Sequence, residues 1–74
     1  MLKMTSRELC NYVIEENSPY DYRWLNYVYR TEGAEGLKDI ARSTVEGFAP
    51  SGASKQLIGR AVTLVYLELK NILQ

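Results

Sequence analysis

Five apolar residues near the end of the chain recur at helical spacing, and this pattern constrains the fold more than any other feature. Their separations alternate between four and three residues, as in a helix that packs along one stripe against its neighbours. We therefore expect one long helix over about 54–73, lying as the central element of a helical bundle. The stripe consists of Ile58, Val62, Val65, Leu69 and Ile72.

A helix is also expected near the N-terminus, over about 6–16. Thr5 and Glu8 have the spacing of a capping box, in which each side chain satisfies a free backbone N–H group at the start of a helix. One face of this segment is apolar, which favours packing against the long helix. That face consists of Leu9, Cys10, Val13 and Ile14.

The segment from residue 18 begins with two residues that favour a helix start. Ser18 is a good N-cap, and Pro19 is tolerated in the first turn, where a missing N–H group breaks no hydrogen bond. Because Gly33 is a good stop, a helix is predicted over about 19–31. The residues expected to face the core are Tyr22, Leu25, Val28 and Tyr29.

A fourth helix is expected over about 34–48, where apolar residues fall on one side at helical spacing. Gly, Pro and Ser in the following segment, 47–54, predict a loop. No segment alternates apolar and polar residues over the length of a strand. The chain is therefore predicted to be all-α, a compact four-helix single domain over residues 1–74. The apolar residues of the fourth helix are Ala34, Leu37, Ile40, Ala41, Val45 and Phe48.

Composition limits how a domain of this size is stabilised. A chain of 74 residues buries too small a share of its surface to be very stable from its core alone. One cysteine and no histidine exclude an intramolecular disulfide and a zinc site of Cys and His ligands. Basic and acidic residues both number nine, and zero net charge argues against strong nonspecific attraction to nucleic acid and favours association. We therefore expect stability to depend on packing and on partners.

No set of residues has the pattern of a catalytic site. Histidine, the commonest general base near neutral pH, is absent. The neighbours Glu15 and Glu16 point about 100° apart on a helix, and Cys10 lies among apolar residues, where a thiol is unreactive. The segment 47–55 is close to a phosphate-binding loop but has Ala53 where that motif needs lysine. The protein is therefore predicted to be no enzyme and to hold neither cofactor nor metal.

The most unusual segment is 20–30, which holds four of the six tyrosines and the only tryptophan. On a helical wheel, three aromatic residues form a stripe opposite the expected core side, and two arginines border it. Such residues are enriched at binding hot spots, whereas the outer face of a surface helix is normally polar. We expect this stripe to be partly exposed and to bind a partner; the alternative is a central helix with both faces in the core. It consists of Tyr20, Trp24 and Tyr27, with Arg23 and Arg30.

Three leucines of the C-terminal helix lie off its main stripe: Leu57, Leu64 and Leu67. Together they form an apolar strip beyond what one helix contact requires. Either this helix touches three neighbours at once, or two copies of the chain present the same strip to each other in a homodimer.

The second half of the chain also has the order of parts of a helix-turn-helix. DNA readers of that type join their helices by a turn of three or four residues, whereas the loop here is about twice as long and contains Pro50. Side chains at the start of the C-terminal helix are nevertheless suited to contact bases and phosphates. The candidate nucleic-acid contacts are Arg42, Ser54, Lys55 and Arg60.

These features favour a non-enzymatic protein–protein interaction module; the alternative is a small helix-turn-helix-like DNA-binding regulator. Complete proteins of this length without catalytic residues are common in phages and other mobile elements, and this analogy of size and composition suggests a regulatory or inhibitory role. The N-terminus lacks a signal-peptide pattern. The most apolar stretch, 61–69, is too short to span a membrane and contains Glu68. We therefore expect a cytoplasmic protein without membrane contact.

Overall fold

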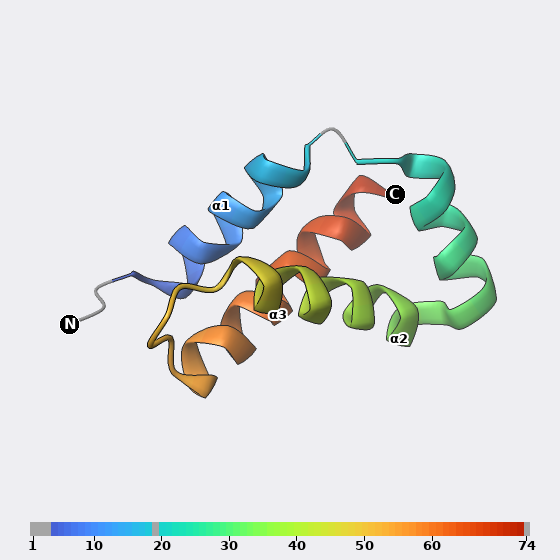
Figure 1. The fold of residues 1–74 in the computed structure, drawn as a ribbon. Helices are drawn as coiled ribbons and strands as arrows, with labels where there is room; N and C mark the ends of the chain where they lie inside the picture. The colour runs from blue at the N-terminus through green and yellow to red at the C-terminus, as the bar shows by residue number, and fades with distance from the viewer. Residues whose placement is uncertain (1–3, 19, 74) are drawn as a thin grey trace.

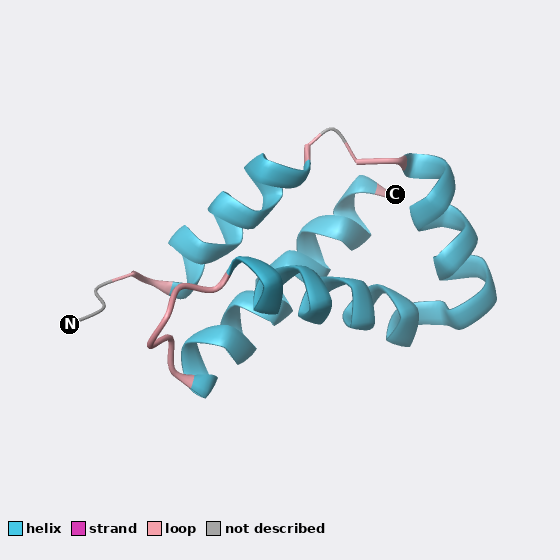
Figure 2. Cartoon of the chain, in the orientation of Figure 1, coloured by secondary structure: helices cyan, strands magenta, loops and turns pink. Residues whose placement is uncertain are grey.

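The computed structural model describes residues 4–18 and 20–73, and helices make up most of that part of the chain. The helices are α1 (Ser6–Asn17), α2 (Tyr22–Phe48) and α3 (Lys55–Ile72), as Figures 1 and 2 show. No strand is present in the described residues, so the all-α prediction is confirmed. The predicted count of four helices is not, because the segments expected over 19–31 and 34–48 are joined in α2.

Helix α1 starts at the predicted capping box. The Thr5 hydroxyl accepts a hydrogen bond from the backbone N–H of Glu8 at 3.1 Å, and the Glu8 carboxylate accepts one from the N–H of Thr5 at 3.0 Å. The Thr5 N–H, and to a lesser degree the Thr5 hydroxyl, hold the pKa of the Glu8 carboxyl below its ordinary value, because they stabilise its charged form. The apolar face packs inward as expected, with Leu9, Cys10 and Val13 buried and Ile14 half-buried.

The start of α2 differs from the prediction. Asp21, not Ser18, is the N-cap: its carboxylate accepts hydrogen bonds from the N–H groups of Arg23 at 3.0 Å and Trp24 at 3.2 Å. A negatively charged side chain is also favoured by the helix dipole at this end. Ser18 instead ends α1, where its N–H donates to the carbonyl of Glu15 at 3.3 Å. Pro19, the expected first-turn residue, lies outside the described residues.

Helix α2 changes direction at Gly33, which has a φ of 69° and a ψ of −156°. Glycine adopts a positive φ without the steric cost that a side chain adds, which explains this residue type at the bend. The residue predicted to stop a helix thus joins two arms, the first arm (22–32) and the second arm (34–48). Gly36 is buried beside the bend, and a Cβ there would lie 2.7 Å from Cγ1 of Val28 on the first arm. A glycine therefore allows this close contact.

Helix α3 is the central element, as its heptad pattern predicts. Both α1 and α2 pack against it and contact each other much less (Figure 1). Ser54 caps α3, since its hydroxyl accepts a hydrogen bond from the N–H of Leu57 at 3.0 Å. Val62 and Val65 are buried, as predicted for the centre of the stripe. The core consists of Leu9, Cys10, Val13, Leu25, Leu37, Ala41, Val45, Ala61, Val62, Val65 and Leu69.

The apolar side of the second arm is buried mainly at its centre. Of its predicted core residues, Leu37, Ala41 and Val45 are buried and Ile40 is half-buried. Ala34 and Phe48, at the two ends of the arm, are exposed. The Phe48 ring instead lies edge-on to Tyr12 of α1, with 5.8 Å between the ring centroids, so this contact links the end of α2 to α1.

Candidate functional site

The first arm of α2 presents most of its side chains to solvent. Only Leu25 and Val28 are buried, so the arm attaches to the rest of the molecule along one narrow edge. Trp24 is 50% exposed and Tyr27 is 66% exposed. The predicted exposure of these two rings is confirmed, and the alternative in which both faces of this segment lie in the core is wrong for them.

Tyr20 does not belong to the same surface, although a helical wheel assigns it there. It precedes the N-cap of α2, so helical periodicity does not apply to it, and its ring is half-buried against the core. Its hydroxyl is buried and has no hydrogen-bond partner among the described residues. Burial raises the pKa of this hydroxyl, and the nearby Cys10 thiol raises it further. Tyr20 is therefore a packing residue.

Two other tyrosines take the place of Tyr20 on this surface. Tyr22 and Tyr29 are expected from the wheel to face the core, but they are 59% and 38% exposed. The arm packs along the line of Leu25 and Val28 alone, which leaves the tyrosines on its flank. The signal in the sequence that could have shown this is that Leu25 and Val28 are the only aliphatic residues on the expected core side of the first arm.

The two arginines of the arm lie between its aromatic residues. Arg23 and Arg30 are seven residues apart and therefore point in nearly the same direction on a helix. On one side of them lie Tyr22 and Tyr29, and on the other side Tyr27 and then Trp24. Both arginines are exposed, and neither has an ion pair within residues 4–18 and 20–73. We call the set of Tyr22, Arg23, Trp24, Tyr27, Tyr29 and Arg30 the aromatic–arginine face.

Trp24 also borders a shallow cleft beside the bend of α2. The cleft has a volume of about 360 Å³, and its lining includes the carboxylates of Glu32 and Asp39. A group that packs against Trp24 at this edge would thus meet acidic side chains, whereas a group over the centre of the face would meet two guanidinium groups. The surface therefore favours a ligand that carries charges of both signs at matching positions.

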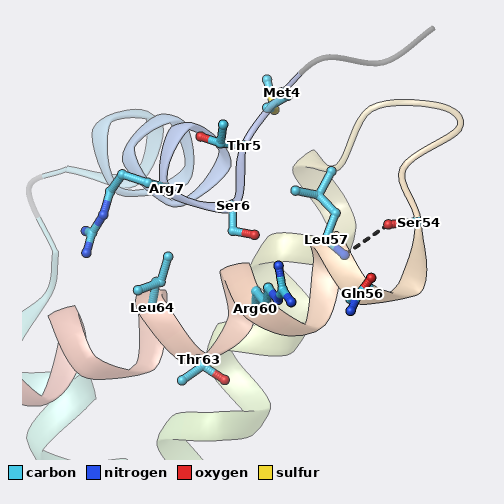
Figure 3. Close-up of a pocket in the computed structure, with 10 residues that line it drawn as sticks. All are labelled: Met4, Thr5, Ser6, Arg7, Ser54, Gln56, Leu57, Arg60, Thr63 and Leu64. Carbon is cyan, nitrogen blue, oxygen red and sulfur yellow. Dashed lines mark hydrogen bonds between the residues drawn. The ribbon is translucent and has the colours of Figure 1, made fainter.

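The three leucines of α3 do not form one exposed strip. Leu57 and Leu64 are half-buried and point toward the N-terminal turn of α1, where they line a groove of about 740 Å³ with Arg60 between them (Figure 3). Only Leu67 is exposed, at 52%, and it lies in a different groove, between α2 and α3. The start of α1 covers the strip that the sequence alone leaves open. A homodimer through α3 stays a prediction, and it would rest on Leu67 alone.

The candidate nucleic-acid contacts are spread around α3. Ser54 is occupied as the N-cap, whereas Lys55 and Arg60 are exposed on the first two turns. Arg42 lines the groove between α2 and α3. The six residues that connect these helices, 49–54, exceed the turn of a helix-turn-helix, as the sequence indicates.

Comparison with protein-family models, with curated proteins and with solved structures found no significant match to this chain. Within the described part of the chain, no three Cys, Asp or Glu side chains gather as metal ligands would. No helix of that part is both long enough and apolar enough to cross a bilayer.

Proposed function

We propose that this protein is a non-enzymatic interaction module that binds a protein partner in the cytoplasm through the aromatic–arginine face. The observation that supports this most strongly is the exposure of four aromatic rings within eight residues of one helical arm. Tyr, Trp and Arg are the residues that dominate binding energy at protein interfaces. A helix also holds them in place before binding, so little ordering entropy is lost when the partner docks.

The charges of the face indicate the chemistry of the partner. Arg23 and Arg30 have no ion pair in the described part of the chain, and a guanidinium group binds a carboxylate through two parallel hydrogen bonds. The cleft beside Trp24 carries the opposite sign through Glu32 and Asp39. A complementary partner would present an apolar patch for the rings, acidic groups opposite the arginines and a basic group at the cleft. Binding without catalysis suits a regulator or inhibitor of the partner.

Affinity capture with matched variants tests the proposal. Wild-type chain, immobilised and exposed to extract of the cells that produce it, should retain a specific protein, identified by mass spectrometry. The double variant Trp24→Ala with Tyr27→Ala should weaken that binding by at least about a hundredfold, since each hot spot contributes about 2 kcal/mol or more. Its circular dichroism and melting temperature should stay close to wild type, because both rings are exposed.

The control is Tyr12→Ala, which removes an exposed aromatic ring from α1 instead. This variant should retain the partner. If the double variant binds as well as wild type, the aromatic–arginine face is not the binding surface. If it unfolds, the rings are part of the core and the proposal is wrong.

A further inference from the structure

A second surface, on α3, differs from the first in its chemistry. Its solvent-facing ridge consists of Gln56, Gly59, Arg60, Thr63 and Leu67, all exposed. A groove runs along each side of the ridge, one toward α1 and one, of about 400 Å³, toward α2. Thr63 lines both grooves, so they open on the same side of the molecule. We call the ridge and its two grooves the α3 face.

Basic side chains lie on both sides of the ridge. Lys38 and Arg42 line the groove toward α2, and Arg60 lines the groove toward α1. Lys38 stands over the ring of Tyr66, with its Nζ 5.7 Å from the ring centroid. Arg7 also borders the groove toward α1, but its guanidinium points away from the other lining residues (Figure 3) and pairs with Glu68 at 3.6 Å. The cations available on this face are therefore Arg42 and Arg60, together with Lys38, whose own ion pair with Glu35 is longer, at 3.9 Å.

Acidic side chains are kept off this face. No Asp or Glu is among the described residues that line either groove. Glu35 lies at the edge, where it reaches Lys38 only at 3.9 Å. The segment 55–73 carries three basic residues and one acid, whereas the rest of the chain carries six basic residues and eight acids. Zero net charge thus results from two regions of opposite sign, and it does not exclude a polyanion at α3.

We infer that the α3 face binds the phosphate backbone of double-stranded DNA, with the ridge of α3 in the major groove. The major groove of B-form DNA is about 12 Å wide and admits one helix, so phosphates of both strands flank a helix that lies in it. Cations on both sides of an exposed helix match that arrangement. Gly59 adds no side chain to the ridge, and a Cβ there would have no atom within 4 Å, so the approach is open.

The ridge also carries groups that suit base edges. Gln56 is a residue type that makes paired hydrogen bonds to adenine, and Leu67 offers an apolar contact to a thymine methyl group. This inference goes beyond the partner-binding function, because none of these residues belongs to the aromatic–arginine face. The two proposals can therefore fail separately.

Fluorescence anisotropy of a labelled mixed-sequence duplex of about 20 base pairs, at about 50 mM salt, tests the inference. The full chain should bind, and the logarithm of its affinity should fall with the logarithm of salt concentration with a slope of about −2.7, as expected for three phosphate contacts. Arg42→Glu with Arg60→Glu should weaken binding at least about tenfold and make the slope shallower by about 2.

Arg23→Glu with Arg30→Glu is the matched control, because it changes the net charge equally on the other surface. It should leave DNA binding within about twofold of wild type. If the two double variants lose DNA affinity equally, overall charge and not the α3 face attracts the DNA, and the inference is wrong. Absence of DNA binding by the wild type would also overturn it. Equal affinity for single-stranded DNA, for an RNA duplex or for polyglutamate would also overturn it, because none of these offers the B-form major groove. If the Glu variants do not fold, Arg42→Gln with Arg60→Gln replaces them, with the same tenfold loss expected.

Discussion

At the scale of single residues, Tyr20 and Trp24 show where helical periodicity predicts the structure and where it ends. Residues four apart share a face of a helix, and on that basis both belong to one stripe. The exposure of Trp24 agrees with this pattern. The partial burial of Tyr20 does not agree with it, because Asp21 caps the helix and Tyr20 therefore lies before the helix begins. Ser18 and Asp21 are both good N-cap residue types, so the sequence does not decide between them. Helical periodicity thus predicts which residues belong to the candidate site only for residues that lie inside the helix.

The packing of Tyr20 leads to a prediction about its hydroxyl group. A buried hydroxyl without a hydrogen bond costs about 1–3 kcal/mol of desolvation, so Tyr20→Phe should stabilise the protein. We expect its melting temperature to rise by roughly 4–8 °C for each kcal/mol gained in a domain of this size. Tyr27→Phe, which removes an exposed hydroxyl, should leave the melting temperature unchanged. A lower melting temperature for Tyr20→Phe would show that its hydroxyl has a partner in the native protein.

At the scale of elements, the sequence indicates where a helix is interrupted but not how the chain continues beyond the interruption. Gly33 is recognisable as a stop, yet the chain re-enters a helix at once and α2 continues in a new direction. The direction depends on a contact between the arms, since Gly36 is buried close to Val28. Local patterns do not report a contact of this kind. For the same reason, the flanking Tyr22 and Tyr29 are assigned to the core by the wheel but lie at the surface.

The bend predicts opposite effects of the same substitution at two glycines. Gly36→Ala should destabilise the protein by about 1–3 kcal/mol, because its Cβ would lie 2.7 Å from Val28 Cγ1 and from Glu32 Cβ. Gly59→Ala, in open space within α3, should instead stabilise it by about 0.5–1 kcal/mol through helix propensity. Urea denaturation of both variants measures the two effects. Stabilisation by Gly36→Ala would contradict the packing at the bend.

At the scale of the whole molecule, the stripe on α3 predicts the central helix correctly, because a heptad pattern depends on one element alone. The arrangement of charge, by contrast, is not predictable from composition. The composition gives only a net charge of zero, whereas the fold separates a basic α3 face from a more acidic remainder. Arg42 and Arg60 are recognisable from the sequence as possible DNA contacts. Lys38 and Thr63 are not, because grooves between packed helices bring them to the same face.

The molecule as a whole therefore offers one surface of aromatic rings and arginines and another of basic side chains around a helix. The first carries the proposed function, and that function requires its rings to be free of the core in the isolated protein. Trp24 is the only tryptophan, so the intrinsic fluorescence of the chain reports directly on this face.

Acrylamide quenching of Trp24 fluorescence, in the native protein and in the urea-unfolded chain, tests this claim most directly. Because Trp24 is half exposed, we expect its emission in the native protein to be red-shifted. We also expect the rate constant for acrylamide quenching in the native protein to be a large fraction of its value in the unfolded chain. Blue-shifted emission with almost no quenching in the native protein would place Trp24 in the core. That result would contradict the exposed aromatic–arginine face on which the proposed function rests.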